Sequence, residues 1–505
     1  MTSPSLWPQE EARRVAERWP GRDTYILETG FGPSGHPHLG TVGEVVRTYY
    51  VAMALHQMGK RTELVVFSDD MDGLRKIPKN VSVPWLEEHL GKPVSRIPDP
   101  YGCCESYSAH MNQELNGMLA KTGIEYRFVS STDMYSGGAF DPVIKLMFRQ
   151  GREILDLMLP TLRQENRAGW FFWQPVCEHC GRVNTTVVTD WDPAAARVKY
   201  ACTGKFRGVK GCGYTGEQDA LGGRGKLGWK VDWAARWYHF PVSFEMFGKD
   251  LIDSAKLSSA IVKMIKGDPP LQMFYEMFLT EEGKKISKSV GDGVSLENFH
   301  RWGTQDAVNL LMLRKPRQQK QLGPETIIRY MDEALTLNKE APEYPFVYHH
   351  GAPPNLDGLR LSDLISLMGV LGMNDPGLVR SYLERSFGSE QIDRRWSYLE
   401  GLLEKAWNYY EDFILPSRQV PVLEPEQWGL VDEFVGLINR ETDAEAVQNG
   451  VFAIARAHGL PPAEYFKLLY QVLLGTDSGP RVGTFVRLVG KEKVTEIIRA
   501  ARVAP

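Results

Sequence analysis

Pro33-Ser34-Gly35-His36-Pro37-His38-Leu39-Gly40 follows the apolar run Tyr25-Ile26-Leu27 and precedes an amphipathic stretch at residues 42–58. This order predicts a strand, a glycine-rich turn and a helix. Glycines in such a turn let the backbone approach a ligand closely, and the N-terminus of the following helix favours an anion. His38 can donate a hydrogen bond to a phosphate oxygen. The stretch therefore predicts a phosphate site, while a plain βα turn is the alternative interpretation of the loop alone.

A second motif, Lys284-Lys285-Ile286-Ser287-Lys288-Ser289, lies about 250 residues further on in a segment rich in glycine and charge. Its three lysines and two serines can clamp a triphosphate through charge-assisted hydrogen bonds. A solvated basic loop is the alternative. Together and in this order, the two motifs indicate activation of a carboxylate by ATP.

These motifs also resemble those of a known family. His38-Leu-Gly-Thr41 resembles the HIGH signature of class I aminoacyl-tRNA synthetases, and Lys285-Ile-Ser-Lys-Ser289 resembles their KMSKS loop. Four further stretches narrow the resemblance to the class I type of lysyl-tRNA synthetase: Glu28–Gly35, Ser68–Leu74, Phe247–Asp250 and Gly479–Gly483. The resemblance extends over nearly the whole chain.

The resemblance implies a ligase that activates L-lysine with ATP and Mg²⁺ and transfers lysine to tRNA(Lys). Such chemistry depends on positioning and on stabilisation of phosphate charge. The implied catalytic residues are His38, His36, Lys288 and Lys285. The implied ATP-binding residues are Pro33, Ser34, Gly35, Gly40, Gly248, Asp250, Ser287 and Lys288. A lysine side chain suits a carboxylate for its ammonium group and an aromatic wall for its stem, and the candidates are Glu28, Gly30, Gly32, Trp229 and Trp233.

Two positions depart from the family pattern. Thr41 stands where the signature has its last histidine, and Leu251 follows Asp250 where many relatives have histidine. Asp250 is alternatively a helix N-cap. Glu28 is alternatively a helix cap or a surface charge, and the two tryptophans are alternatively core residues. Two other functions also stay open: a class I synthetase for glutamate, glutamine or cysteine, and a non-catalytic RNA-binding relative. Intact His38 and Lys288 argue against the non-catalytic relative.

The cysteines predict zinc. Cys177-Glu-His-Cys180 is a knuckle, and Cys202 and Cys212 follow it at a spacing that suits a tetrahedral structural site, although their gap is wider than a standard knuckle. Redox-active or inert cysteines are the alternative. His179 lies between the first two ligands and is expected to point outward.

The remaining cysteines are adjacent. Asp99, Cys103, Cys104 and His110 supply four plausible ligands, and the resemblance is compatible with a second zinc site there. The alternative is two buried cysteines at a helix start. With all six thiols assigned to metal, no disulfide is needed, which fits a reducing compartment.

The chain has 505 residues, 43% of them hydrophobic, and a net charge of only −4, so charge alone does not indicate nucleic-acid binding. We expect a cytoplasmic monomer without a membrane segment. The expected fold is α/β: a doubly wound, Rossmann-type parallel sheet with a zinc-containing insertion and an all-helical C-terminal domain. Sheet structure is expected to resume after the insertion at Gly228–Trp233. The expected regions are the two halves of the catalytic domain at 1–100 and 226–265, the insertion at 101–225, the KMSKS-loop and stem-contact region at 266–340 and the anticodon-binding domain at 341–505.

Overall fold

The computed structural model describes residues 5–503, except residues 80, 82, 168, 281–282, 284–295, 372–373 and 418–421. The chain forms two compact units. The first consists of Met1–Leu296 with Met312–Leu322, and the second of Glu297–Leu311 with Gly323–Pro505. The KMSKS-like motif, with Lys285, Ser287 and Lys288, lies outside the described residues.

A five-stranded sheet organises the first unit. Its order is β12–β11–β1–β2–β3, and all four pairings are parallel. The strands are β1 (Thr24–Phe31), β2 (Arg61–Ser68), β3 (Arg127–Ser130), β11 (Phe244–Gly248) and β12 (Leu271–Tyr275). The order runs outward from β1 in both directions, so the doubly wound sheet is confirmed, and a ligand crevice is expected where β1 meets β11. Strands β3 and β12 lie outside the ranges 1–100 and 226–265 expected for the two halves of the sheet.

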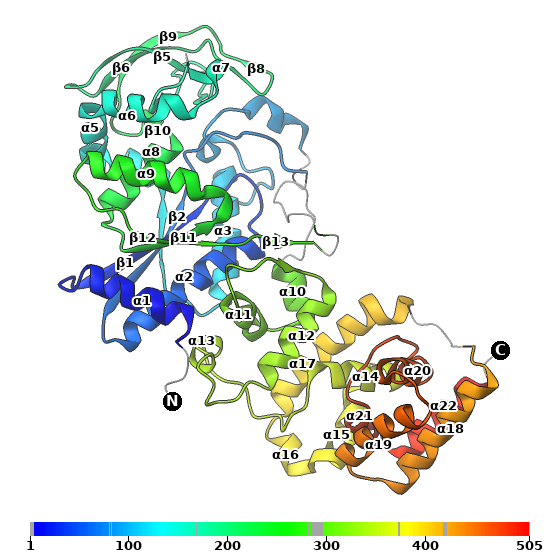
Figure 1. Ribbon diagram of the computed structural model, residues 1–505. Coiled ribbons are helices and arrows are strands. Elements are labelled where there is room, and N and C mark those ends of the chain that lie inside the picture. The colour runs from blue at the N-terminus through cyan, green and yellow to red at the C-terminus, as the bar shows by residue number, and fades with distance from the viewer. Residues whose placement is uncertain are drawn as a thin grey trace. The chain divides into compact units, whose positions relative to one another are not determined.

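Helices cover both faces of this sheet (Figure 1). The side chains of β2 point alternately to the two faces of the sheet. On one face, Val65 and Phe67 join a core with α8 (Trp229–His239) and α9 (Ile252–Met264). Helix α2 (Leu39–Gln57) contacts β1, β2 and β11, and α1 (Trp7–Arg18) packs on α2. The helix expected at 42–58 is thus confirmed, and it begins beside the signature loop.

Between β3 and α8, the chain forms short helices and small sheets, in the region where an insertion is expected at 101–225. Its helices are α4 (Ser131–Ser136), α5 (Asp141–Arg149), α6 (Gly151–Met158) and α7 (Gln164–Arg167). Its strands are β4 (Trp173–Pro175), β5 (Val187–Asp192), β6 (Arg197–Ala201), β7 (Lys205–Phe206), β8 (Val209–Lys210), β9 (Thr215–Asp219) and β10 (Gly225–Leu227). They form three small antiparallel sheets: β5–β6–β9, β4–β10 and β7–β8.

The sheet structure expected at Gly228–Trp233 is wrong, because these residues begin helix α8. The alternation of tryptophan, valine and charged residues suggested a strand. However, Trp233 and Trp237 share one face at helical spacing, and both are buried. Tertiary burial of this face therefore overrides the local preference for a strand.

Residues 323–503 of the second unit, where described, form helices and no strand, which confirms the all-helical C-terminal region (yellow to red in Figure 1). The helices are α12 (Pro324–Leu335), α13 (Tyr344–Val347), α14 (Leu361–Leu371), α15 (Pro376–Phe387), α16 (Ser389–Asp393), α17 (Trp396–Tyr409), α18 (Pro425–Arg440), α19 (Ala444–Ala457), α20 (Pro462–Leu474), α21 (Val482–Val489) and α22 (Lys491–Val503). Further elements are α3 (Tyr107–Ala120) in the first unit and, before α12, α10 (Leu296–Trp302) and α11 (Gln305–Leu313). The short strands β13 (Phe278–Leu279) and β14 (Lys320–Gln321) pair in parallel. Among the described residues, none of the helices has the length and apolar character needed to cross a membrane.

Candidate active site

His38 is the N-cap of helix α2. Its Nδ1 accepts a hydrogen bond from the backbone N–H of Thr41 at 3.2 Å, and the Thr41 hydroxyl lies 3.4 Å from the same nitrogen. A neutral imidazole whose Nδ1 accepts a hydrogen bond carries its proton on Nε2. Thr41, the departure from the family signature, thus fixes the tautomer of His38 and leaves Nε2–H as the ring's donor.

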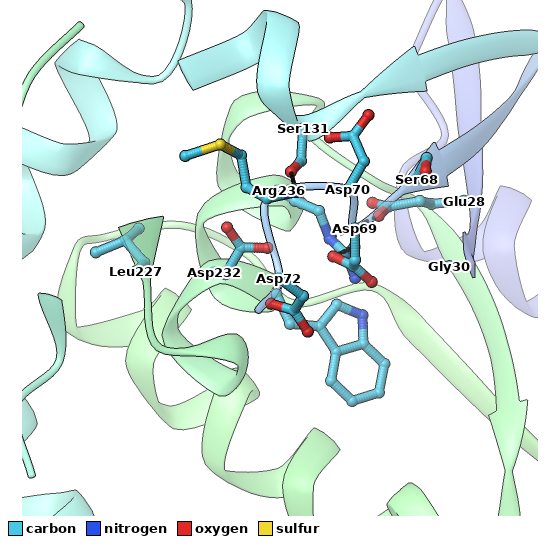
Figure 2. Close-up of polar contacts among 12 residues, drawn as sticks. Glu28, Gly30, Ser68, Asp69, Asp70, Asp72, Ser131, Leu227, Asp232 and Arg236 are labelled. Atoms are coloured by element: carbon cyan, nitrogen blue, oxygen red, sulfur yellow. Dashed lines mark hydrogen bonds and ion pairs between the residues drawn. The ribbon is translucent and has the colours of Figure 1, made fainter. Parts of the chain in front are cut away.

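A group of buried and half-buried charged side chains lies near the carboxyl ends of β1 and β2; we call Glu28, Asp69, Asp72, Lys226, Asp232, Arg236 and Glu245 the charge cluster. Figure 2 shows Glu28, Asp69, Asp72, Asp232 and Arg236 of this cluster. Arg236 of α8 is its centre. Its Nη1 donates to Asp69 Oδ1 at 2.9 Å, and its Nε lies 3.0 Å from Glu28 Oε1 without the alignment of a hydrogen bond. The guanidinium also lies over the ring of Phe67, 4.5 Å from the centroid.

The outer members of the charge cluster have partners of their own. Lys226 pairs with Asp72, and the Tyr135 hydroxyl donates to Asp232. Glu245 is the neighbour of Glu28 across the β1–β11 pairing. It accepts hydrogen bonds from two indoles, those of Trp233 and Trp237.

Burial raises the pKa of Glu28 to about 7, with Arg236 opposing the shift and nearby carboxylates adding to it. Burial likewise raises the pKa of Asp69 to about 6 and raises the pKa of Glu245. Within the charge cluster five carboxyl groups face two cations, and Arg75 pairs with Asp72 from outside it, so the acids still outnumber the cations once they ionise. Such a group is suited to a cationic ligand.

A cavity of about 360 Å³ opens above the charge cluster. Its walls come from the signature loop, the loop after β2 and the β7–β8 hairpin: Gly32, Pro33, Ser34, Gly35, Asp69, Asp72, Gly73, Arg75, Lys76, Pro78, Val94 and Arg207. Asp69 and Asp72 keep 26% and 29% of their side-chain surface exposed, whereas Glu28 is fully buried. A ligand in this cavity therefore meets Asp69 and Asp72 before Glu28.

The structure brings most of the predicted lysine-binding residues to this region. A methyl group at Gly30 would lie 3.6 Å from Arg236 Nη2, so Gly30 borders the charge cluster, and Gly32 lines the cavity. Trp233 is tied to Glu245, and Trp229 stacks on Trp233 with centroids 5.7 Å apart. Glu28 is the counter-ion of Arg236, so the interpretation of Glu28 as a surface charge is wrong.

The predicted nucleotide residues are divided between two places. Pro33, Ser34 and Gly35 line the cavity. Gly248 ends β11, where an added Cβ would lie 2.8 Å from Asp250 Oδ1, and Asp250 is exposed. His36 differs from the expectation: Glu114 and Tyr101 occupy its two ring nitrogens, at 2.6 and 2.8 Å.

Both cysteine groups converge in a way that suits a metal. The sulfurs of Cys177 and Cys212 lie 3.7 Å apart, as do those of Cys180 and Cys202. Four thiolates around zinc at 2.3 Å give sulfur–sulfur distances of about 3.8 Å. His179 is exposed and stacks on Tyr214, in agreement with the expectation that it points outward.

In the second group, the ligand atoms of Asp99, Cys103, Cys104 and His110 lie within 4.8 Å of one another. His110 Nδ1 is 3.2 Å from Cys103 Sγ and 3.5 Å from Asp99 Oδ1. Cys103 is exposed and Cys104 is half-buried, so the alternative of two buried cysteines is wrong.

Sequence reasoning missed much of the charge cluster: Asp69, Asp72, Lys226, Asp232, Arg236 and Glu245. The stretch Ser68-Asp-Asp-Met-Asp-Gly-Leu74 provided a signal for two of them, because carboxylates after a buried strand lie at the ligand-binding edge of the sheet. Asp232 and Arg236 had a weaker signal in their i, i+4 spacing, which places both on one helix face. No signal identified Glu245.

A nucleotide-type loop at the point where the strand order reverses, opening onto a cavity with an acidic floor, is the arrangement expected of a class I aminoacyl-tRNA synthetase. The family model described as tRNA synthetases class I (K) matches residues 5–349. The lysine–tRNA ligase of Rickettsia bellii is 34% identical over 514 residues, 97% of each chain. That of Rickettsia conorii is 35% identical over 520 residues, 98% of this chain and 97% of the relative. The chain therefore belongs to the tRNA synthetases class I (K), the lysyl branch of the class, and is a ligase.

Gly40 provides a first test of the His38 geometry. A Cβ on Gly40 would lie 2.8 Å from His38 Cε1 and 3.0 Å from Nδ1, closer than carbon contacts allow. Gly40→Ala is therefore expected to displace the imidazole and lower kcat for adenylate formation by about 10- to 100-fold, since a misplaced catalytic group costs this much. ATP–pyrophosphate exchange measures the effect. Gly21→Ala is the control, because nothing lies within 4 Å of its added Cβ, and equal activity of the two variants would contradict the assigned position of His38.

Proposed function

We propose that this protein is a lysine–tRNA ligase that converts L-lysine and ATP into lysyl-adenylate and pyrophosphate and then transfers lysine to tRNA(Lys). The carboxylate oxygen of lysine attacks the α-phosphorus of ATP, the bond from that phosphorus to the bridging oxygen breaks, and pyrophosphate leaves. A hydroxyl of the terminal adenosine of the tRNA then takes the lysyl group, and AMP leaves. The observation that carries the proposal is the full-length similarity to lysine–tRNA ligases.

The charge cluster supports lysine as the substrate. Arg236 is already neutralised by Glu28 and Asp69, so it is not available to hold the side-chain carboxylate of an acidic amino acid beside them. The other cations, Arg75, Lys76 and Arg207, line the cavity. The ammonium group of lysine adds the positive charge that the cluster lacks, with Asp69 and Asp72 as its first contacts in the cavity. Gly30, Trp229 and Trp233 shape the surroundings of Glu28. The same excess of acid disfavours glutamate as substrate.

The nucleotide roles follow from position. His38 donates its Nε2–H to the α-phosphate as charge develops there, and backbone groups at Pro33, Ser34 and Gly35 lie against the nucleotide. Asp250 accepts from ribose hydroxyls beside Gly248. The sequence resemblance assigns Lys285, Ser287 and Lys288 to the β- and γ-phosphates. Mg²⁺ bound with ATP supplies further neutralisation of phosphate charge when present.

We propose that the helical second unit binds the anticodon arm of tRNA and that the enzyme acts in the cytoplasm as a monomer. All six cysteines are free, and they lie in two groups whose ligand atoms are close enough to bind a metal ion. Free cysteines suit a reducing compartment.

ATP–pyrophosphate exchange with each of the twenty amino acids, tRNA present, tests the function. Exchange is expected with lysine alone and is expected to be lost in Lys288→Ala. Exchange with glutamate alone would reject lysine as the substrate, and no exchange with any amino acid would favour a non-catalytic RNA-binding relative. Binding of tRNA by a filter assay separates that last outcome from an inactive preparation.

Lysine recognition is expected to depend on pH, because the pKa of Glu28 is raised to about 7 and that of Asp69 to about 6. Lowering the pH from 8 to 6 protonates these acids, so the KM for lysine is expected to rise roughly tenfold while the KM for ATP stays constant. The effect of these acids on folding stability has the opposite dependence on pH from their effect on lysine binding. A carboxyl group whose folded pKa is raised adds stability at low pH and loses that contribution as the pH rises through 7. A lysine KM that is flat between pH 6 and 8 would contradict the role of these acids.

We propose that both cysteine groups hold structural zinc: Cys177, Cys180, Cys202 and Cys212 in one site, and Asp99, Cys103, Cys104 and His110 in the other. The purified chain is expected to contain about two zinc ions, measured by inductively coupled plasma mass spectrometry. Cys180→Ser and Cys104→Ser are each expected to lose one ion, because each removes a thiolate ligand from a different group. Unchanged zinc in either variant would reject that site.

A further inference from the structure

Helix α3 and the loop before it connect the second cysteine group to the signature loop. The Tyr107 hydroxyl, at the start of α3, donates to the backbone carbonyl of Ser34 at 3.1 Å. Glu114, two turns further along α3, lies 2.6 Å from His36 Nδ1 through its Oε2. The Tyr101 hydroxyl is 2.8 Å from His36 Nε2. The segment from Tyr101 to Glu114 therefore contacts the signature loop at two of its residues, Ser34 and His36.

The carboxylate of Glu114 is shared between two histidines. Its Oε2 faces His36 of the signature loop, and its Oε1 lies 3.2 Å from His110 Nε2. The other ring nitrogen of His110 faces Cys103 and Asp99. Tyr101, which contacts His36, also stacks on the His110 ring with centroids 4.2 Å apart and planes at 24°. His110 thus belongs to the cysteine group on one side and to Glu114 on the other.

This arrangement has a physical consequence. A histidine that binds metal through one ring nitrogen donates a hydrogen bond from the other, and a carboxylate is its common acceptor. Metal at Nδ1 of His110 fixes the proton on Nε2, and that N–H holds Oε1 of Glu114. Oε2 then has a fixed position from which to hold His36. Loss of the metal frees the His110 ring to turn, and the hold on the signature loop weakens.

We propose that Glu114 is a positioning residue that couples the Asp99–Cys103–Cys104–His110 metal site to the ATP signature loop through His36. The coupling rests on the proposed function, since it takes ATP at this loop and metal at this site. Because linkage is reciprocal, metal at the site favours ATP binding, and bound ATP retards loss of the metal. His36, which sequence alone placed among the phosphate-stabilising residues, has a different task in this scheme: it connects the loop to α3.

Zinc release from the full-length, zinc-loaded enzyme tests the coupling directly. Release is followed with a chromogenic chelator, with and without a saturating non-hydrolysable ATP analogue. The analogue is expected to slow release of one zinc ion by about tenfold, within the usual range of coupling between sites. Release of the other ion, from the four-cysteine site, is expected to stay unchanged and serves as an internal reference. In Cys104→Ser, which lacks the zinc ion of the Asp99–Cys103–Cys104–His110 site, the slowly released ion should be missing, and this identifies the protected ion.

Glu114→Gln is the decisive variant. The amide retains the shape of the carboxylate, but it is uncharged and has only one oxygen, so it cannot accept hydrogen bonds from both histidines. It is expected to reduce protection by the analogue to less than twofold and to raise the KM for ATP about tenfold, with the KM for lysine unchanged. Glu125→Gln makes the same chemical change at an exposed position in the turn after α3 and is expected to behave as wild type. A merely structural role for Glu114 would lower stability without this selective effect on ATP.

Each other outcome overturns the coupling. Protection retained in Glu114→Gln, or no protection in a wild-type enzyme that performs exchange, would reject it. The double variant Cys103→Ser/Cys104→Ser should retain only the zinc ion of the four-cysteine site. A second zinc ion retained in it would place metal on His36, His110 and Glu114, whose ligand atoms also converge, and would reject the relay in favour of direct coordination. Absence of exchange in the wild type would instead mark failure of the proposed function itself.

Discussion

His38→Ala is expected to lower kcat for lysine-dependent ATP–pyrophosphate exchange by about 10²- to 10³-fold, with the KM for ATP changed less than threefold. Removing one well-placed donor to a developing oxyanion has an effect of this size. His38 is the histidine that the structure holds by a backbone N–H at the start of α2, so the proton of its neutral ring is on Nε2 before ATP binds. The effect should therefore appear in the chemical step. Single-turnover formation of lysyl-adenylate measures that step without product release.

His56→Ala is the matched control, since His56 is an exposed histidine in the last turn of the same helix. It is expected to retain wild-type exchange. His38→Asn should recover part of the rate, because its amide keeps a donor close to the same place. A loss confined to the KM for ATP would contradict the role in the transition state and leave His38 as a ground-state contact.

Arg236→Met is expected to lower the free energy of unfolding of the first unit by about 3–5 kcal/mol, the usual cost of removing one partner from a buried ion pair. The substitution leaves Glu28 and Asp69 without their shared cation, and it removes the guanidinium from the face of Phe67. Lysine-dependent exchange should be lost as well, because the loop after β2 is held by Asp69. Urea unfolding followed by tryptophan fluorescence measures the change, since Trp233 and Trp237 report on α8.

The double variant Glu28→Gln/Arg236→Met separates charge from packing. Neutralising Glu28 removes one of the two uncompensated carboxylates, so the double variant is expected to regain about 1–2 kcal/mol over Arg236→Met. Arg149→Met, on the exposed side of α5, is the control and should change stability by less than about 0.5 kcal/mol. No recovery in the double variant would show that the arginine stabilises through packing and not through its charge.

The elements with a regular pattern could be predicted from the sequence. The first βαβ unit, the helical C-terminal region and the four-cysteine group all follow from periodicity or spacing, which are local properties of the chain. Helix α8 could not, because six residues of alternating tryptophan and charge fit a strand as well as a helix. Only the sheet and α9, which pack against α8, decide between them.

The charge cluster shows a second limit of sequence reasoning. Asp72 and Lys226 are far apart in the chain, and charged residues are ordinarily exposed. Their burial depends on partners that the fold brings together, so nothing local to either residue predicts it. Thr41 is a contrasting case. The sequence shows that threonine replaces the last histidine of the signature, and the structure shows that the backbone N–H of Thr41 gives His38 a defined tautomer.

The strands that pair with β1 also determine when its two edges can be covered during synthesis on the ribosome. Leu27 of β1 pairs with Phe244 of β11, whereas β2 follows β1 after one helix. At synthesis rates of roughly 5–20 residues per second, β1 keeps one edge unpaired for about 10–40 s after it is made. During that interval the nascent chain exposes backbone donors and acceptors of a central, apolar strand, the type of surface that invites wrong pairing. The strand that carries the catalytic loop is therefore a central strand whose second edge is protected only after the whole insertion has been made.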